Sequence, residues 1–348
     1  MLQKSSDPFA DWHSGSPKLR VHAIDADALY AAQGRTLVKL SFTGQPQAFN
    51  KFHFDVPDGL FRATELGRRL WRAGIHHVVC FKDKLVIFID KLVLAISSVD
   101  GSIVGSPVAL TESRPLAVCN AANEKLYYGE YNGIKKGNSS GIILSEDGIH
   151  WTEIYRLRNI RHIHGIYFDP YGKSIWVTTG DADTESGLWV TGDGFKTIER
   201  ALGGSQQTRA IQLLFTQTHV YFGSDTSLEK NFIYRMDKRT GHVEQLQEVE
   251  SSVFWGCKVG DSLFFSTAVE PSQVNTSRYA FIWGSQDGEK WRRVAAFRKD
   301  LWPMRLFQYG QIHFPTGKND TGCLFFTPVA TEKHGTIQRL KVTDLFGD

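Results

Sequence analysis

The feature that most constrains this fold is a short turn motif that recurs at an even spacing along the chain. Its copies are residues 145–151 (SEDGIHW), 285–291 (SQDGEKW), 191–197 (TGDGFKT) and 98–101 (SVDG). Successive copies start about 47 residues apart, and the gap before the last copy is about twice as long. The skipped unit retains a turn at 236–241, and one more period leads to a turn at 331–335. A fixed period of this length is typical of repeat folds such as propellers.

Each repeat contains four short apolar segments separated by turns rich in Gly, Asp and Asn, which is the pattern of one propeller blade. The unit at 114–158 shows it best, with the segments PLAVCN, KLYYGEY, GIILS and WTEIYRL. We therefore expect an all-β fold, a seven-bladed β-propeller of four-stranded antiparallel blades, in a single domain over residues 1–348. The expected blades are 19–56, 75–111, 114–158, 161–202, 208–250, 252–297 and 304–344. In the last blade the strands are expected at 304–309, 311–316, 323–329 and 337–342.

A helical insertion is expected at 57–74, between the first two blades. Within 58–73 apolar residues recur at helical spacing, and several arginines lie on the other faces. Such a helix caps the ring, or it serves as a mobile lid or as a docking surface for another subunit.

The bulk composition excludes several classes of partner. A net charge of +3 is too small to indicate nucleic-acid binding. No segment approaches the roughly 18 consecutive apolar residues of a membrane span, and residues 1–20 lack the apolar stretch of a signal peptide. The four cysteines show no metal-ligand spacing, which favours core residues in a reducing compartment. We therefore expect a cytoplasmic protein that has no cofactor.

The Ser-x-Asp-Gly-x-x-Trp units resemble the Asp box, or BNR repeat, of sialidases and related propeller proteins. Residues 161–181 (RHIHGIYFDPYGKSIWVTTGD) also resemble a stretch of uncharacterised bacterial Asp-box proteins. In such a turn the Asp and Ser side chains hydrogen-bond backbone amides, and the Trp packs between sheets. The resemblance therefore implies that the units are structural and lie on the face opposite the active site.

On the other face we expect a cluster of arginines that binds an anion. The starts of the innermost strands carry Arg114, Arg161, Arg209 and Arg305, and two other blades present His76 and Trp255. Buried arginines are costly unless an anion compensates them, and the planar guanidinium favours carboxylates and sulfates. These six residues are candidates for substrate binding. Alternatively, each arginine pairs with a blade acid, for which the candidates are Glu130, Asp181, Asp183, Asp225, Glu229 and Glu270.

Proton-transfer groups are expected beside these arginines. His162 and His164 share one face of a strand because of their i, i+2 spacing, and Tyr131 is expected near them. Imidazole and phenol groups in such a site suit general acid–base catalysis. The carboxylate candidates are Glu130, Asp181 and Glu270. Two histidines are too few ligands to predict a metal site, so none is predicted.

The sialidase resemblance implies an arginine triad for a carboxylate, a Tyr/Glu nucleophile pair and an aspartate acid. Glu130 and Tyr131 match the pair, whereas the Phe/Tyr-Arg-Ile-Pro element that opens the sialidase propeller is absent. Propeller-shaped polysaccharide lyases offer a second template, in which arginine neutralises a uronate carboxylate. We therefore expect a hydrolase or lyase that acts on an acidic oligosaccharide or polysaccharide. The alternative is a non-catalytic propeller that binds a glycan or a protein partner in a polysaccharide-assembly pathway.

Overall fold

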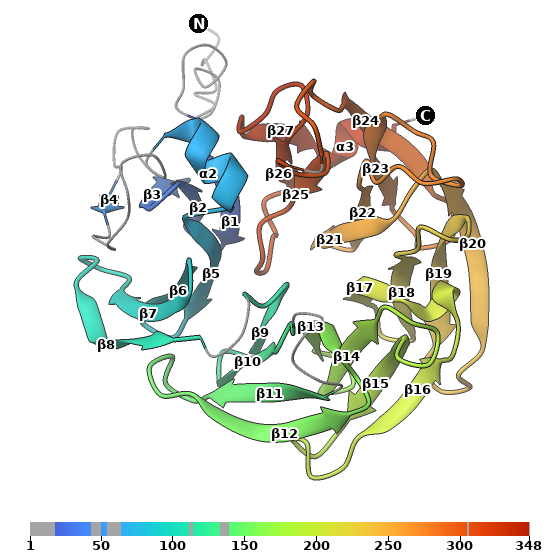
Figure 1. The fold of residues 1–348 in the computed structure, drawn as a ribbon, viewed down its shortest axis with the longest axis horizontal. Coiled ribbons are helices and arrows are strands. Elements are labelled where there is room, and N and C mark those ends of the chain that lie inside the picture. Colours follow the sequence, from blue (N-terminus) through green and yellow to red (C-terminus); the bar gives the residue numbers. More distant parts are fainter. Residues whose placement is uncertain are drawn as a thin grey trace, which may run out of the picture.

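The protein forms seven antiparallel sheets around a central axis, which confirms the predicted seven-bladed β-propeller (Figure 1). The computed structural model describes residues 18–42, 50–53, 64–110, 114–132, 139–304 and 306–347. In each sheet the strand order follows the chain order, and the first strand lies nearest the axis (Figure 1). Six sheets have four strands, and the seventh has three in the described part of the chain.

The strands fall into consecutive groups along the chain. Blades one and two are β1 (Arg20–Ile24), β2 (Ala28–Gln33), β3 (Thr36–Ser41), β4 (Asn50–His53) and β5 (Ile75–Phe81), β6 (Lys84–Ile89), β7 (Leu92–Ser97), β8 (Ile103–Ala109). Blades three and four are β9 (Val118–Ala121), β10 (Lys125–Gly129), β11 (Ser139–Ser145), β12 (Thr152–Arg158) and β13 (His162–Asp169), β14 (Ser174–Gly180), β15 (Gly187–Thr191), β16 (Glu199–Gly203).

The remaining blades follow the same pattern. Blades five and six are β17 (Ala210–Phe215), β18 (His219–Ser224), β19 (Asn231–Asp237), β20 (Val243–Val249) and β21 (Val253–Val259), β22 (Ser262–Thr267), β23 (Tyr279–Ser285), β24 (Arg292–Arg298). Blade seven is β25 (Gln311–His313), β26 (Cys323–Val329) and β27 (Gln338–Lys341). The helical elements are α2 (Glu65–Trp71), the 3-10 turn η1 (Gln206–Thr208) and α3 (Val342–Leu345). No helix in these described ranges is long and apolar enough to cross a bilayer.

The hydrophobic core lies between adjacent blades. The second strand of blade two, β6 (KLVIFI), is buried at every position but its first, because neighbouring sheets cover both of its faces. The outermost strand β12, in contrast, is largely exposed or half-buried. Between blades two and three, the Phe88 ring meets the rings of Tyr128 and Trp151 edge-on, at centroid distances of 5.6 and 5.8 Å. Aromatic contacts of this kind join one blade to the next.

The recurring turn motif closes the connection between the third and fourth strands. Oδ1 of Asp147 accepts hydrogen bonds from the backbone amides of Ile149 and His150, both at 2.8 Å. The Ser145 hydroxyl accepts one from the amide of Gly148, whose φ of 78° lies in the left-handed region. The copy at 285–291 repeats these bonds through Ser285 and Asp287. The motif therefore orders the turn.

Blade seven differs from the prediction. Residues 304–309 were expected as its innermost strand, but they form no strand in the described part, and Arg305 lies outside the described residues. The innermost strand is β25 instead. The segments that were expected as the second, third and fourth strands of this blade are therefore its first, second and third strands. Two backbone hydrogen bonds support this strand order: the Gly260 amide, in the β21–β22 turn, donates to the Asn319 carbonyl, and the Leu19 amide, just before β1, donates to the Gly335 carbonyl. The first bond places the β25–β26 connection on the face that carries the turn motif. The turn at 331–335, which follows β26, therefore lies on the opposite face.

The loop that precedes β25 packs against α2, which explains why 304–309 does not join the sheet. Asp300 forms an ion pair with Arg69 of α2 at 2.7 Å. The rings of Trp302 and Phe307 pack edge-on at 4.9 Å, and the Arg69 guanidinium lies over both of them. These long-range contacts outweigh the local strand propensity of the segment.

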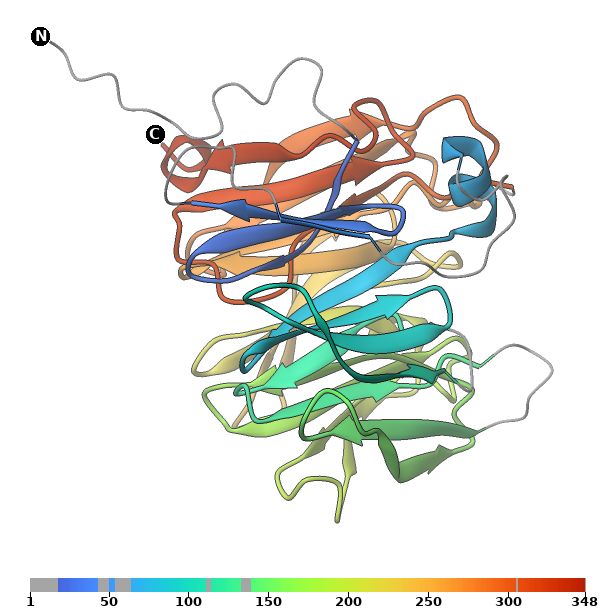
Figure 2. The ribbon, with the colours of Figure 1, turned by 90° about the vertical axis from the view of Figure 1, so that its left-hand side faces the viewer.

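Helix α2 is the described part of the predicted insertion, whose residues 57–63 lie outside the described residues. The Thr64 hydroxyl caps it by accepting a hydrogen bond from the Gly67 amide at 3.0 Å. Figure 2 shows α2 on one face of the ring, beside the edges of the sheets. Glu65 forms an ion pair with Lys18 at 2.5 Å, while Arg69 reaches the loop after blade six. The helix thus bridges the first and last blades, and its role as a lid or docking surface stays a prediction.

Glycines at the ends of second strands let the next blade approach. A methyl group at Gly129 would lie 2.1 Å from Cγ2 of Ile163 in blade four, and one at Gly223 would lie 2.4 Å from Cβ of Val253 in blade six. Real atoms do not approach so closely, so a larger side chain at either position forces the two blades apart.

We expect Asp147→Ala to lower the free energy of unfolding by about 1–2 kcal/mol, because two backbone amides lose their acceptor. Although burial raises the pKa of this carboxyl, its bonds to His150 and to backbone amides hold the pKa well below its ordinary range. The stabilisation is therefore complete at neutral pH and is lost as the pH falls below about 4, through the lowered pKa of the folded state. Urea unfolding of both proteins at several pH values measures this difference.

The exposed neighbour Glu146 provides the control, since Glu146→Ala is expected to leave stability within about 0.5 kcal/mol of wild type. Loss of ligand binding by Asp147→Ala at unchanged stability would show that the motif belongs to the functional face.

A second prediction concerns the blade interface. Gly129→Ala should lower the free energy of unfolding by about 1–3 kcal/mol, because its methyl group overlaps Ile163. Gly192→Ala is the matched control, since no atom lies within 4 Å of the added methyl group. Equal thermal stability of the two variants would contradict the close approach of these blades.

Candidate functional site

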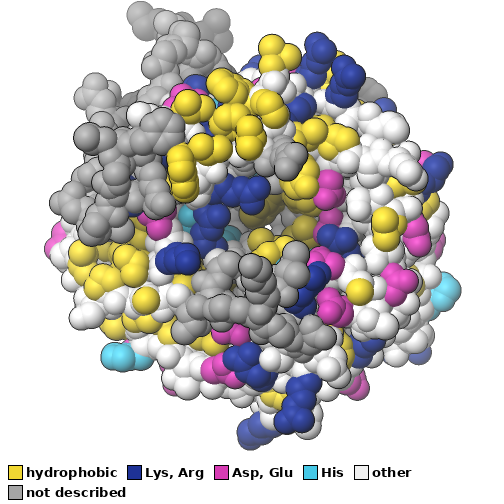
Figure 3. Space-filling model, viewed as in Figure 1, with side chains coloured by type: hydrophobic (Ala, Val, Ile, Leu, Met, Phe, Trp, Pro, Cys, Tyr) yellow, Lys and Arg dark blue, Asp and Glu magenta, His cyan; other side chains and the backbone are white. Residues whose placement is uncertain are grey.

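The innermost strands surround a cavity of about 630 Å³ on the axis. Every blade contributes to its wall, with Arg20, His76, Tyr131, His164, Arg209, Glu270 and Gln311 coming from blades one to seven in turn. Figure 3 shows this hollow, with Lys and Arg side chains gathered on one side of the axis and with Asp and Glu side chains, interspersed with further Lys and Arg, on the other. The cavity therefore has two walls of opposite charge.

The basic wall consists of Arg20, Arg72, Arg114 and His76. The Arg114 Nη1 atom lies 2.7 Å from Nε2 of His76 and donates to the backbone carbonyl of Arg72. The Arg20 guanidinium donates to the carbonyls of Ile75 and His76. Among the described residues, none of the three arginines has a carboxylate within ion-pair distance, 4.0 Å. Within the described ranges, no ion pair therefore neutralises their positive charge.

Burial and neighbouring charge shift the pKa values of Arg20 and His76. Burial, together with the charge of Arg114, lowers the pKa of Arg20 to about 10. Burial and the charges of Arg114 and Arg20 hold the pKa of His76 well below its ordinary value. His76 is therefore neutral at pH 7, and it can accept the hydrogen bond from Arg114.

Three further histidines line the cavity beside the basic wall. Burial lowers the pKa of His77 to about 4, although its contact with the Pro115 carbonyl at 2.8 Å opposes the change. Burial and the charge of Arg20 keep His22 and His313 neutral by lowering their pKa values. Trp255 packs on His313 with ring centroids 4.3 Å apart. Within the described ranges, no group of three or more His, Cys, Asp or Glu side chains is arranged to hold a metal ion.

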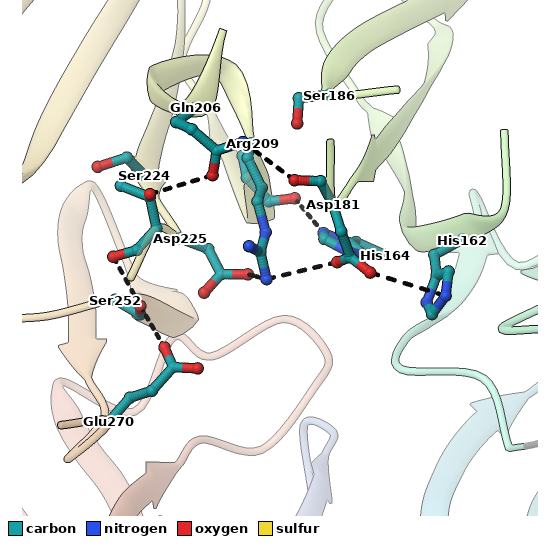
Figure 4. Close-up of polar contacts among 12 residues, drawn as sticks. His162, His164, Asp181, Ser186, Gln206, Arg209, Ser224, Asp225, Ser252 and Glu270 are labelled. Carbon is teal, nitrogen blue, oxygen red and sulfur yellow. Dashed lines mark hydrogen bonds and ion pairs between the residues drawn. The ribbon is translucent and has the colours of Figure 1, made fainter. Parts of the chain in front are cut away.

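The acidic wall consists of Asp225 and Glu270, which follow the second strands of blades five and six (Figure 4). Arg209 Nη2 lies 3.2 Å from Oδ2 of Asp225. The Ser252 hydroxyl donates to Oε2 of Glu270 at 2.5 Å. Burial and the charge of Asp225 raise the pKa of Glu270 above its ordinary value. The two carboxyl groups thus repel each other in a poorly solvated place.

Tyr131 and His164 lie between the two walls and line the cavity. His164 Nδ1 lies 3.1 Å from the Ala210 carbonyl, and its Nε2 lies 3.4 Å from Oδ1 of Asp181. The rings of Tyr131 and His164 are 6.3 Å apart. Burial, with the charge of Asp181, raises the pKa of Tyr131 to about 12, so the phenol keeps its proton. Both side chains therefore border the cavity, and Tyr131 carries a phenolic proton there.

Asp181 holds several predicted site residues together beside the cavity. It forms an ion pair with Arg161 at 2.5 Å, a second with Arg209 at 3.4 Å, and lies 3.7 Å from Nε2 of His162. Burial raises its pKa, but His164 and Arg209 lower it well below its ordinary value. Burial also lowers the pKa of His162 to about 4.

The structure separates the predicted residues into two sets. Residues that line the cavity are Arg114, Arg209, His76, Trp255, Tyr131, His164 and Glu270. For Arg161 the alternative of pairing with a blade acid holds, because Asp181 neutralises it. Glu130 is buried, accepts a hydrogen bond from the Gly141 amide at 2.8 Å and pairs with Arg156, and it is not among the residues that line the cavity. The Glu130–Tyr131 nucleophile pair therefore stays a prediction.

Arg20 of the basic wall was not assigned to the site from the sequence, and Asp225 was a candidate there only as the partner of an arginine. Arg20 begins the innermost strand of blade one, so its repeat position carried the same signal as Arg114. Asp225 follows a second strand, as Asp181 does in the preceding blade. Arg72 carried no repeat signal, because it comes from the C-terminal cap of α2, at φ 52°.

The fold and the axial cavity define the class of protein, a seven-bladed β-propeller with a charged central cavity. No protein-family profile matches the sequence, and no curated protein matches it. Among solved structures the chain is similar to an extracellular domain assigned to a one-component system of B. thetaiotaomicron, with 12% identity and a TM-score of 0.57. That match covers 94% of this chain but only 38% of the other.

A chain of a mitotic checkpoint complex is similar as well, with 9% identity and a TM-score of 0.54 over 80% of this chain and 79% of that one. At these identities the likeness shows the propeller fold alone.

Proposed function

We propose that the protein is an enzyme that acts on an acidic saccharide bound in the axial cavity. The observation that carries this proposal is the basic wall, in which Arg20, Arg72 and Arg114 face the cavity without a carboxylate partner in the described chain. Uncompensated charge in a partly buried place is costly, and a bound anion relieves it. The guanidinium plane matches a carboxylate or sulfate, the acidic groups of saccharides.

A proton donor faces the same cavity. Hydrolysis and elimination both need a proton for the departing glycosidic oxygen. Hydrolysis also needs a water molecule as nucleophile, whereas elimination needs a base that removes the proton α to a carboxylate whose charge is neutralised. Tyr131 can supply that proton because its phenol stays protonated, with a pKa of about 12. His164 lies next to it and is held by the Ala210 carbonyl and Asp181. The enzyme is therefore proposed as a hydrolase or a lyase, with Tyr131 as the donor.

The alternative is a non-catalytic propeller that binds an acidic glycan. One observation favours it: Asp181 and Asp225 are both engaged by Arg209, so neither carboxylate is available as a nucleophile. Binding and turnover therefore have to be measured separately.

Binding should depend on Arg114 more than on Arg161. Arg114→Gln should weaken the affinity for an oligogalacturonide at least about tenfold, equivalent to about 1.4 kcal/mol, because the basic wall loses an unpaired charge. Arg161→Gln should change it less, because Asp181 already neutralises that guanidinium. Calorimetry at low and high salt measures both effects, and the affinity of wild type should fall with salt. Equal losses in the two variants would contradict the placement of the anion at the basic wall.

Turnover should depend on the Tyr131 hydroxyl. Tyr131→Phe should lower the rate by about 100-fold or more while the affinity for the saccharide stays within about twofold. Reducing ends, and the absorbance of an unsaturated uronate, are followed on sialylated and uronate-containing glycans. Reducing ends alone indicate hydrolysis, and both signals indicate elimination. Binding without either product over the whole panel would overturn the proposed enzyme and leave the non-catalytic binder.

A further inference from the structure

The acidic wall contains a buried carboxylate oxygen without a donor. Asp225 is only 2% exposed and lines the cavity. Its Oδ2 atom faces Arg209, but its Oδ1 atom is buried and has no hydrogen-bond partner among the described residues. A buried acceptor of this kind costs free energy until a donor reaches it.

Glu270 lies close enough to Asp225 for their charges to interact, and it is also short of partners. Its described contact is the hydroxyl of Ser252, which donates one hydrogen bond to Oε2. Figure 4 shows the two carboxylates approaching from neighbouring blades, with Ser252 near them. A cation in the cavity beside these two groups would offset their repulsion.

Arginines do not already fill this role. Arg209 is shared between Asp181 and Asp225, at 3.4 and 3.2 Å, and Arg161 is turned to Asp181 at 2.5 Å. Neither reaches Glu270 within ion-pair distance among the described contacts. On the opposite side of the same cavity, the arginines of the basic wall lack an anion, whereas the acidic wall lacks a cation.

We infer that the natural ligand is zwitterionic: an amino sugar that carries its acidic group to the basic wall and its ammonium group to Asp225 and Glu270. The inference rests on the proposed anion site, and it adds a binding site for a positive charge on the same ligand. A cavity of about 630 Å³ holds both walls, and pockets of this size enclose ligands as large as one or two sugar rings. A free ammonium supplies three donors, whereas an acetamide at the same carbon supplies one and carries no charge.

Two commercial sugars test this charge with little other change. Muramic acid and N-acetylmuramic acid carry the same ring and the same carboxylate, and they differ in whether the nitrogen is a free amine. Calorimetric titration at about pH 6 keeps the amine protonated. We expect wild-type protein to bind muramic acid at least about tenfold more tightly than the acetylated sugar, and to bind glucosamine, which lacks the carboxylate, more weakly than either.

Glu270→Gln should reduce the preference for muramic acid to about twofold or less while the affinity for N-acetylmuramic acid stays near that of wild type. Glu248→Gln, on the exposed outer strand β20, is the matched control and should keep the preference. Because Asp225 is buried against Arg209, Asp225→Asn is interpreted only after its melting temperature is shown to match wild type.

The outcomes separate the two proposals. Equal binding of both sugars would overturn the ammonium site while leaving the anion site in place. Binding of glucosamine as tight as that of muramic acid would overturn the anion site and with it the proposed function. If Glu270→Gln keeps the preference for muramic acid over N-acetylmuramic acid, the acidic wall does not recognise the ammonium group of the ligand.

Discussion

The packing of each sheet against its two neighbours is the interaction on which the rest of the structure depends. A single blade leaves both apolar faces of its middle strands uncovered, so it gains stability only when the ring is complete. The close approach of Gly129 to Ile163, and of Gly223 to Val253, sets how far each blade can turn towards the axis. Seven blades packed in this way leave the axis open. The cavity is thus a geometric product of the sheet packing, and its walls are made by the starts of first strands and the ends of second strands.

Charge compensation decides which of the arginines at that rim remain available to a ligand. In blades four and five, Asp181 and Asp225 follow the second strands and neutralise Arg161 and Arg209. The corresponding acid of blade three, into which Arg114 leads, is Glu130 after β10, but it is used elsewhere. It accepts a hydrogen bond from the Gly141 amide at 2.8 Å and pairs with Arg156 at 3.3 Å. Arg114 therefore keeps its charge, although its repeat position matches that of Arg161. The same repeat thus pairs the arginines of one half of the cavity with acids and leaves the arginines of the other half charged.

The repeat explains why so much of the fold could be predicted from the sequence. Local signals recur in each unit, such as Asp147 and Gly148 in the turn motif, and errors in one unit are corrected by the others. The innermost strand of the seventh blade could not be predicted in this way, because Asp300, Trp302 and Phe307 contact Arg69, which is far away in the sequence. In the site, positions could be predicted but contacts could not. Whether Glu130 meets Tyr131 or Arg156 depends on which way adjacent side chains point at the end of a strand, and spacing alone does not determine that.

The seam between blades seven and one has a consequence for how binding and stability are coupled. No sheet in the described chain crosses this seam. It is joined by backbone hydrogen bonds such as those between Thr316 and His22, and by the bridge that α2 forms through Arg69. Arg20 and Arg72 stand on the first-blade side of that joint, whereas Trp255 and Glu270 belong to blade six. A ligand that touches both groups spans the joint at which the first and last blades of the described chain meet. The free energy of binding then adds to the free energy needed to separate the two blades. Ligand binding and closure of the ring are therefore thermodynamically coupled.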